Sequence, residues 1–220
     1  MQNPVSSSRN RQIAASASLG ALAVILSQVS LPLTLFGFLR FDLAEVIDVL
    51  SFLLLGPTWG LLTLLIHWFG LNVFPSGIPI VGPFMKLLAV LSMFLGFWIT
   101  GKIWKLLVGK KGGGKLFLGL LLVNGALVRV GIMGLANFLL FMFLLPESYL
   151  PFLTGVVGKL GFDVSSNIQV AWISVGLISI FNAIHVPFSV IPAYILLKRI
   201  LKTPAGRIAN SWENRLGLNS

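Results

Sequence analysis

Residues 116–145 read LFLGLLLVNGALVRVGIMGLANFLLFMFLL, and Arg129 is the only charged residue among them. This run exceeds the roughly 20 residues that a helix needs to span the hydrocarbon core of a bilayer. Its two ends, 116–123 and 138–145, are apolar on every face, whereas a strand of a membrane β-barrel alternates apolar and polar residues. The sequence therefore predicts an all-α integral membrane protein, because a helix satisfies its own backbone hydrogen bonds in lipid.

The rest of the chain extends this pattern over its whole length. Of the 220 residues 56% are hydrophobic and 10% are charged, and the mean hydropathy is +0.95. This composition predicts a single membrane domain, 1–220, without a sizeable soluble domain. We expect six transmembrane helices and a polar tail over 201–220. The helices are expected at about 13–29, 43–55, 61–73, 81–107, 116–145 and 170–197. The second and third are shorter than a full span, so we expect them to be tilted or partly embedded in the bundle.

The basic residues predict the orientation of these helices. Of the 16 Lys and Arg, two precede the first helix, five lie within 102–115 and five follow position 197. Because short basic loops remain on the cytoplasmic side, both termini are expected in the cytoplasm of a multi-pass protein of the plasma membrane. The net charge of +10 is spread over small groups at helix ends. Such groups favour contact with anionic lipid headgroups over binding of nucleic acid.

Several common sites are not expected in this chain. Arg9 and Arg11 resemble the charged region of a signal peptide, but more membrane segments follow, so we expect a retained first helix. The segment 109–115, GKKGGGK, fits the start of a phosphate-binding loop. Leu116 nevertheless takes the place of the required hydroxyl, and the segment is interpreted as a flexible basic loop. Two histidines without zinc-ligand spacing, and no cysteine, predict no metal site, and no catalytic residue is expected.

Polar residues within the apolar helices are the best candidates for a site, because burying them in a membrane is costly. At roughly 100° per residue, four of them fall within an arc of about 80° on helix 170–197, namely Ser174, Asn182, His185 and Ser189. Arg129 and Asn137 share a broad face of helix 116–145, and Lys86 lies near the outer end of helix 81–107. These groups are expected to converge on a pocket that opens outward. The alternative is that they hydrogen-bond neighbouring helices, or that Lys86 and Arg129 extend to an interface.

Two further groups of residues have alternative interpretations. Asp42, Glu45 and Asp48 cluster at the start of helix 43–55, where they either stabilise the positive helix terminus or contact a ligand. Ala17 and Ala21 are four residues apart in the first helix, a spacing that lets another helix approach closely in lipid. That partner is either a helix of the same bundle or another subunit.

Five short motifs then occur in a fixed order: FDLAE (41–45), LGPTWG (55–60), RVGIM (129–133), ANF (136–138) and FNAIH (181–185). Together with the alanines of the first helix, they resemble the energy-coupling factor (ECF) S components, most closely the riboflavin-binding type. The resemblance covers about residues 12–200. It implies six helices and a vitamin receptor that works with a transmembrane scaffold subunit and two ATPase subunits. ATP hydrolysis is then expected in the partners, and this chain is not expected to be an enzyme.

The sequence also departs from the riboflavin-binding type. That type usually has Lys where His67 and His185 stand, and Ser-Asp-Ile-Pro where this chain has Ala44-Glu45-Val46-Ile47. A neutral histidine can still donate to and accept from hydroxyl groups, so a ribityl-like chain remains compatible with the site. The transporter class depends less on these positions than the identity of the vitamin does.

The sequence therefore predicts the substrate-binding membrane subunit of an ECF-type vitamin uptake transporter, for riboflavin or a related flavin. Expected ligand-binding residues are Asn137, Asn182, His185, Arg129, Lys86, Phe41 and Asp42. Ala17 and Ala21 are expected to dock on the scaffold subunit, and no cofactor other than the transported ligand is expected. Two alternatives remain: an S component for another small vitamin-like ligand, and a small integral membrane enzyme that acts on lipids through Asp42, Glu45 and Asp48.

Overall fold

The computed structural model describes residues 4–29, 34–36, 39–74, 79–108, 113–203 and 212. Residues 109–112 of the predicted basic loop, and the predicted polar tail apart from 201–203 and Trp212, lie outside this described part. The described chain folds into helices, with one ribbon of two short antiparallel strands, β1 (Thr34–Leu35) and β2 (Leu39–Arg40).

The helices of the described chain follow one another with connections of different lengths, and the one between α1 and α2 contains β1 and β2. They are α1 (Pro4–Ser27), α2 (Ala44–Leu55), α3 (Pro57–Val73), α4 (Val81–Ile103), α5 (Gly114–Leu139), α6 (Pro146–Lys159) and α7 (Asn167–Ile200). A π-helical turn extends α4 (η1, Trp104–Val108), and another extends α5 (η3, Leu140–Leu144). Gly56 separates α2 from α3 with a φ of 94°, which is a conformation that residues with a Cβ rarely adopt. Pro57 then begins α3, where its missing N–H costs no helical hydrogen bond.

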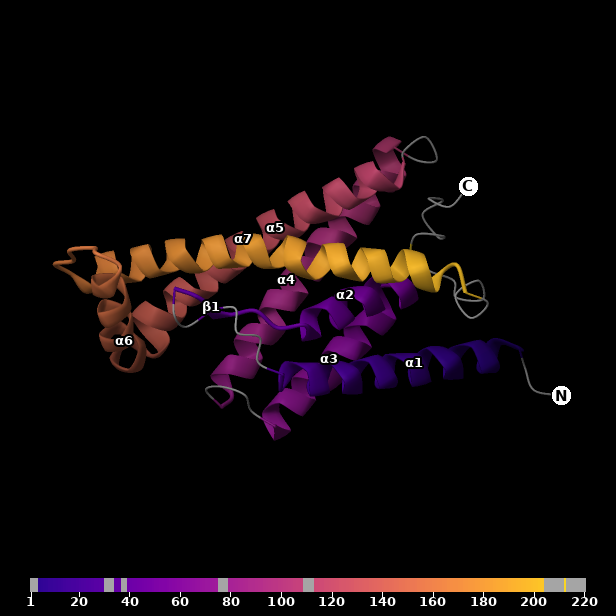
Figure 1. The fold of residues 1–220 in the computed structure, drawn as a ribbon, viewed down its shortest axis with the longest axis horizontal. Helices are drawn as coiled ribbons and strands as arrows, with labels where there is room; N and C mark the ends of the chain where they lie inside the picture. Colours follow the sequence, from indigo (N-terminus) through magenta and orange to yellow (C-terminus); the bar gives the residue numbers. More distant parts are fainter. Residues whose placement is uncertain are drawn as a thin grey trace.

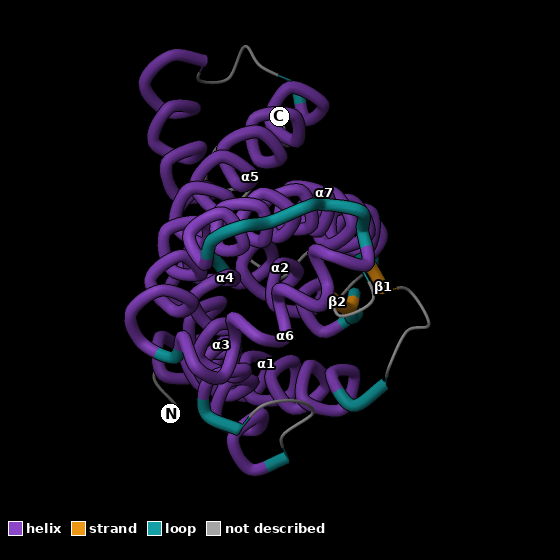
Figure 2. Tube along the Cα trace, turned by 90° about the vertical axis from the view of Figure 1, so that its left-hand side faces the viewer, coloured by secondary structure: helices purple, strands orange, loops and turns teal. Residues whose placement is uncertain are grey.

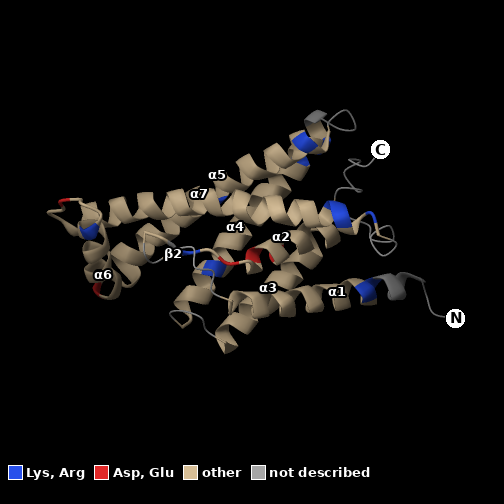
Figure 3. Ribbon diagram, in the orientation of Figure 1, with Lys and Arg blue, Asp and Glu red and all other residues tan. Residues whose placement is uncertain are grey.

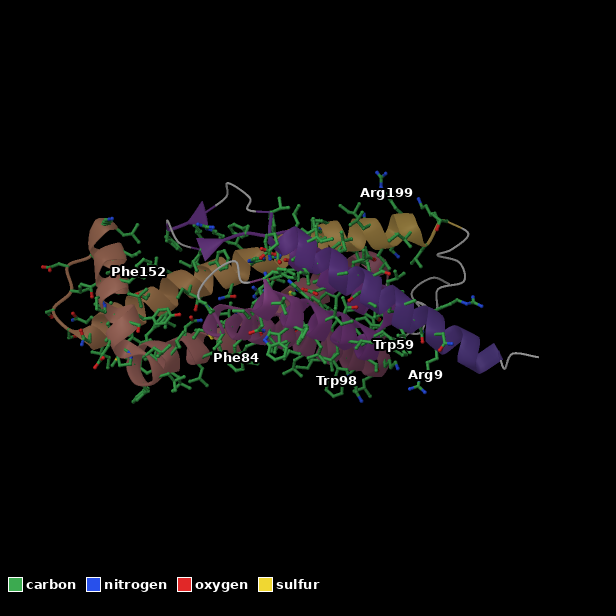
Figure 4. All side chains as sticks on the ribbon, turned by 90° about the horizontal axis from the view of Figure 1, so that it is seen from below. Arg9, Trp59, Phe84, Trp98, Phe152 and Arg199 are labelled. Carbon is green, nitrogen blue, oxygen red and sulfur yellow. The ribbon has the colours of Figure 1, made fainter. Side chains whose placement is uncertain are left out.

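Three stretches are long and apolar enough to cross a membrane by length and composition: Val81–Leu106, Gly114–Leu144 and Asn167–Ile200. They correspond to the three longest predicted helices. The predicted total of six spans stays a prediction. Large apolar side chains extend outward from these helices, including Phe84 and Trp98 of α4, which are 54% and 48% exposed (Figure 4).

The sequence-based boundaries need several corrections. The helix expected from 13 begins at Pro4, and the one expected from 61 begins at Pro57, directly after the single glycine that forms the turn. The segment between the helices expected at 116–145 and 170–197, where no helix is predicted, contains α6. Pro146 begins that helix, and Leu150, Leu153 and Val157 recur along one face, which is buried. Leu150 and Leu153 pack with residues of η3 and α7 in one apolar cluster.

The two ends of the described helical bundle differ in charge. The start of α1 and the end of α7 lie at one end, and α6 lies at the other (Figure 1). Basic residues gather at the first end, and acidic residues of the α2 region lie in the middle of the bundle (Figure 3). Arg9 and Arg199 both extend from the first end (Figure 4). The start of α1 and the end of α7 thus lie at the same end of the bundle, and the cytoplasmic location of both termini stays a prediction.

Helix α2 is the centre of the bundle. It packs against α1, α3 and α7, and all its residues except Leu54 are buried (Figure 2). Phe52 joins the main apolar core, where Trp212 also packs against it with ring centroids 5.1 Å apart. Helices α4 and α5 approach closely at Gly96, where a Cβ would lie 2.4 Å from the carbonyl oxygen of Asn124. This core holds α2 firmly beneath the cavity described next.

Candidate ligand-binding site

A cavity of about 740 Å³ lies where the start of α2 meets α4, α5, α6 and α7. This volume falls within the range of about 300–1,000 Å³ that is usual for small-molecule sites. Its wall is mostly apolar and includes Met85, Met133, Phe141 and Ile178. Tyr149 of α6 adds a hydroxyl, and partial burial raises the pKa of that group. The hydroxyl therefore stays protonated at neutral pH and can donate a hydrogen bond to a ligand.

Glu45 is the centre of a network of charges at this cavity. Its side chain is 1% exposed, and its two carboxylate oxygens accept from Nη1 and Nη2 of Arg129 at 2.6 and 3.2 Å. Lys86 Nζ lies 2.9 Å from the same carboxylate. Because the two-pronged Arg–carboxylate pair fixes both groups geometrically, α2 and α5 are tied together at this point.

Asp42 links the network to the segment that precedes α2. Its Oδ2 accepts from Lys86 Nζ at 2.6 Å, and its Oδ1 accepts from the backbone N–H groups of Ala44 and Glu45 at 3.0 and 3.4 Å. Asp42 therefore bonds the N–H groups at the helix start, as one of the two interpretations predicts, and also forms an ion pair. Its contact with a ligand stays a prediction. The neighbouring acids do not cap the helix, since their carboxylates bind Arg129, Lys86 and His67 instead.

Helix α7 contributes the polar groups on the opposite side of the cavity. Asn182 Oδ1 accepts from Nε of Arg129 at 2.8 Å, and its Nδ2 donates to the carbonyl of Ile178. His185 is 2% exposed, and its Nε2 lies 3.4 Å from Oε2 of Glu45. Among the described residues, neither ring nitrogen of His185 has a hydrogen-bond partner. A buried imidazole without such partners at the wall of a cavity is suited to bind a polar group of a ligand.

Phe41 packs against α7 beside these polar residues. Its ring centroid lies 4.8 Å from that of Phe181, 5.0 Å from that of Phe188 and 5.1 Å from that of His185. These tilted contacts anchor the segment after β2 onto α7. The same segment carries Asp42, so two side chains attach it at the edge of the cavity.

The structure brings the seven predicted ligand-binding residues to this one cavity. All seven line it: Phe41, Asp42, Lys86, Arg129, Asn137, Asn182 and His185. Asn137 uses its Nδ2 to bond the carbonyl of Met133 in its own helix. Lys86 and Arg129 do not extend to an interface, because both are held by Glu45. Their role in ligand binding stays a prediction.

Sequence reasoning did not select Glu45 as a site residue, although it lines the cavity. The available signal was an acid within a predicted membrane helix, in a chain with Arg129 and Lys86 in other predicted helices. A second pair was also missed. Asp48 and His67 are both fully buried between α2 and α3, with Oδ2 and Nδ1 2.8 Å apart. This pair does not line the cavity.

The small residues of α1 divide between two faces. Ser16, Gly20 and Ala23 are buried, and a Cβ on Gly20 would lie 2.8 Å from the side chain of Ile66 in α3. Ala17 and Ala21 are exposed on another face of α1. Within the described chain, α1 therefore packs on α3 through Gly20 and on α2 through Ala23, and these residues differ from the two predicted for docking.

Comparisons with known proteins give one informative result. No family model matches the sequence, and no curated protein matches it. Among solved structures, the S component of a bacterial ECF transporter matches with a TM-score of 0.61 and 23% identity. The match covers 89% of this chain and 99% of that one. At this identity the likeness is one of fold, and it spans nearly the whole of both chains.

Proposed function

We propose that this chain is the substrate-binding membrane subunit of an ECF-type uptake transporter, and that it captures a small vitamin-like molecule. The cavity is the observation that carries the proposal. It has apolar walls, a group of polar side chains and an unpartnered His185, within a fold shared with an S component. Such a combination of apolar surface and few polar anchors is typical of small-molecule sites.

The proposed ligand is riboflavin or a related flavin. A flavin has a flat apolar ring system and a chain of hydroxyl groups, so Phe41 and Phe181 would contact the ring. Asn137, Asn182 and His185 would bond the hydroxyls. A different vitamin-like ligand of similar size is the alternative, because His185 at the cavity replaces a lysine of the riboflavin-binding type.

The proposal includes the partners and the location. Three stretches long enough to cross a membrane support a multi-pass protein, which we place in the plasma membrane with both termini in the cytoplasm. A transmembrane scaffold subunit would dock on the exposed Ala17 and Ala21, and two ATPase subunits would hydrolyse ATP. An enzyme that acts on lipids is less well supported. Its three candidate acids are already engaged, Asp42 and Glu45 with Lys86 and Asp48 with His67.

The first test is an absorbance spectrum of the protein purified in detergent. Flavin bands that persist through washing and are released on denaturation support the receptor and its ligand. If the protein is colourless, mass spectrometry of co-purified small molecules replaces the spectrum, and a flavin is no longer the proposed ligand.

The second test uses variants of the cavity wall. Asn182→Leu and His185→Leu should each weaken ligand binding at least tenfold, since each removes a polar group at the cavity. Asn72→Leu is the matched control, because Asn72 is exposed on α3 and does not line the cavity. Unchanged binding in both cavity variants, with intact folding, would refute the proposed site.

A further inference from the structure

Four of the five charged side chains at the cavity cancel one another. Asp42 and Glu45 supply two negative charges, and Lys86 and Arg129 supply two positive charges. Each charge has an opposite partner within 3 Å: Lys86 lies 2.6 Å from Asp42 and 2.9 Å from Glu45, and Arg129 lies 2.6 Å from Glu45. Arg40 is the other charged residue of the wall, and its side chain is exposed.

Burial makes this balance important for binding. The side chains of Glu45 and Arg129 are 1% and 2% exposed, and that of Lys86 is 18% exposed. A ligand anion placed among them would have to draw Lys86 or Arg129 away from Glu45, which would leave the buried Glu45 carboxylate with only one of its two cations. A ligand cation would compete in the same way for Glu45. Uncompensated buried charges are costly, so either exchange is unfavourable.

The free hydrogen-bonding groups point to a different ligand chemistry. The two nitrogens of His185 lack a partner among the described residues, and a neutral imidazole offers one donor and one acceptor. This combination suits hydroxyl, amide or ureide groups, which also donate and accept without carrying charge.

We propose, resting on the proposed function, that the part of the ligand that enters the Glu45–Arg129–Lys86 region is uncharged, and that Glu45 is the residue that sets this preference. Its carboxylate cancels one of the two buried cations. Without that carboxylate, Asp42 alone opposes Lys86 and Arg129, and the region gains one net positive charge. Glu45 therefore excludes anions that Lys86 and Arg129 would otherwise attract.

Matched pairs of compounds test this preference. Riboflavin 5′-phosphate is compared with riboflavin 5′-acetate, which is similarly extended but uncharged, and nicotinate and pantothenate are compared with nicotinamide and pantothenol. Dissociation constants are measured by calorimetry in detergent at pH 8, where an ordinary imidazole is uncharged. Each measurement is made on the wild type and on Arg40→Gln. The variant removes the exposed cation of the cavity wall, which could otherwise bind the anion outside the buried network.

In the pair that contains the tightest ligand, the charged member should bind roughly 100-fold more weakly, which is about 2.8 kcal/mol at 1.4 kcal/mol per tenfold. In Glu45→Gln that ratio should fall at least tenfold. Glu147→Gln is the matched control, because it makes the same change on an exposed acid of α6 outside this cavity, and it should keep the ratio.

Three results would count against these statements, in distinguishable ways. If the charged member binds Arg40→Gln within threefold of the uncharged one, the inference is wrong while the receptor proposal stands. If the ratio of the two dissociation constants is unchanged in a folded Glu45→Gln protein, Glu45 does not set the preference for an uncharged ligand. If Glu45→Gln does not fold, the wild-type and Arg40→Gln ratios decide alone. If no compound binds the wild type, the proposed function fails, and the inference fails with it.

Discussion

Replacing Arg129 with methionine tests whether the buried network holds the bundle together. Arg129→Met removes three hydrogen bonds to oxygen at once: two to the carboxylate of Glu45 and one to Oδ1 of Asn182. Methionine fills a similar volume without charge, so loss of packing contributes little. Lys86 remains 2.9 Å from Glu45, which leaves that carboxylate partly compensated.

The expected cost follows from these contacts. Removing one partner of a buried ion pair generally costs about 3–5 kcal/mol, because the other charge stays buried. The remaining Lys86 should place this variant near the lower limit, so we expect a loss of about 3 kcal/mol in the free energy of unfolding. In the double variant with Glu45→Met both charges are gone. The loss should then be smaller than the sum of the two single losses by about 2–3 kcal/mol.

The assay is unfolding of the purified protein in mixed micelles, followed by tryptophan fluorescence, for the wild type, both single variants and the double variant. Combining Arg129→Met with Glu147→Gln gives the control, since Glu147 is exposed on α6 and shares no partner with Arg129. Those two effects should add to within about 0.5 kcal/mol. A coupling between Arg129 and Glu45 of less than 0.5 kcal/mol would refute the network as a stabilising unit.

Three further predictions concern other parts of the bundle. Gly96→Ala should cost about 1–3 kcal/mol in the free energy of unfolding, because the new Cβ would lie 2.4 Å from the α5 backbone. In the same denaturation assay the control Gly119→Ala should be neutral or stabilising, because a Cβ there has nothing within 4 Å. Ala17→Trp should leave the melting temperature unchanged and abolish co-purification with the scaffold subunit. A tryptophan at an exposed position of α5 should keep that co-purification. Retained co-purification of the Ala17→Trp protein would contradict the docking role. His67→Leu should cost about 3 kcal/mol by stranding Asp48, and adding Asp48→Leu should recover part of that loss, so a further loss would contradict the pairing.

The sequence predicts the long helices well, because length and composition alone set a membrane span. Helices α4, α5 and α7 lie close to their expected positions, with shifts at the ends where π-helical turns or caps extend them. Helix α6 was missed, because no helix was expected between the helices at 116–145 and 170–197. Its apolar side chains at 150, 153 and 157 were the available signal, and such a short repeat gains its stability from η3 and α7.

The candidate site was predictable in part. Helical periodicity placed Asn182 and His185 on one face, and the cost of burying charge singled out Arg129 and Lys86. Helical periodicity and burial costs do not predict which charged residues pair with one another. Glu45 and Arg129 are 84 positions apart, and only the packing of α2 between α7 and its neighbours brings them within 2.6 Å. From the sequence, one interpretation is that Glu45 stabilises the positive terminus of its own helix. In the structure its carboxylate pairs with Lys86 and Arg129 of other helices instead.

The shortness of α2 and its acidic residues have a common explanation. With 12 residues, α2 is too short to cross a bilayer, and a lipid-exposed Glu45 or Asp48 would be costly. In the structure α2 neither has to cross the bilayer nor exposes these acids to lipid. Helices α1, α3 and α7 pack against it and bury all its residues except Leu54. The helix therefore takes its length from the bundle rather than from the membrane. Its start faces the cavity, where Lys86 and Arg129 hold the carboxylate of Glu45.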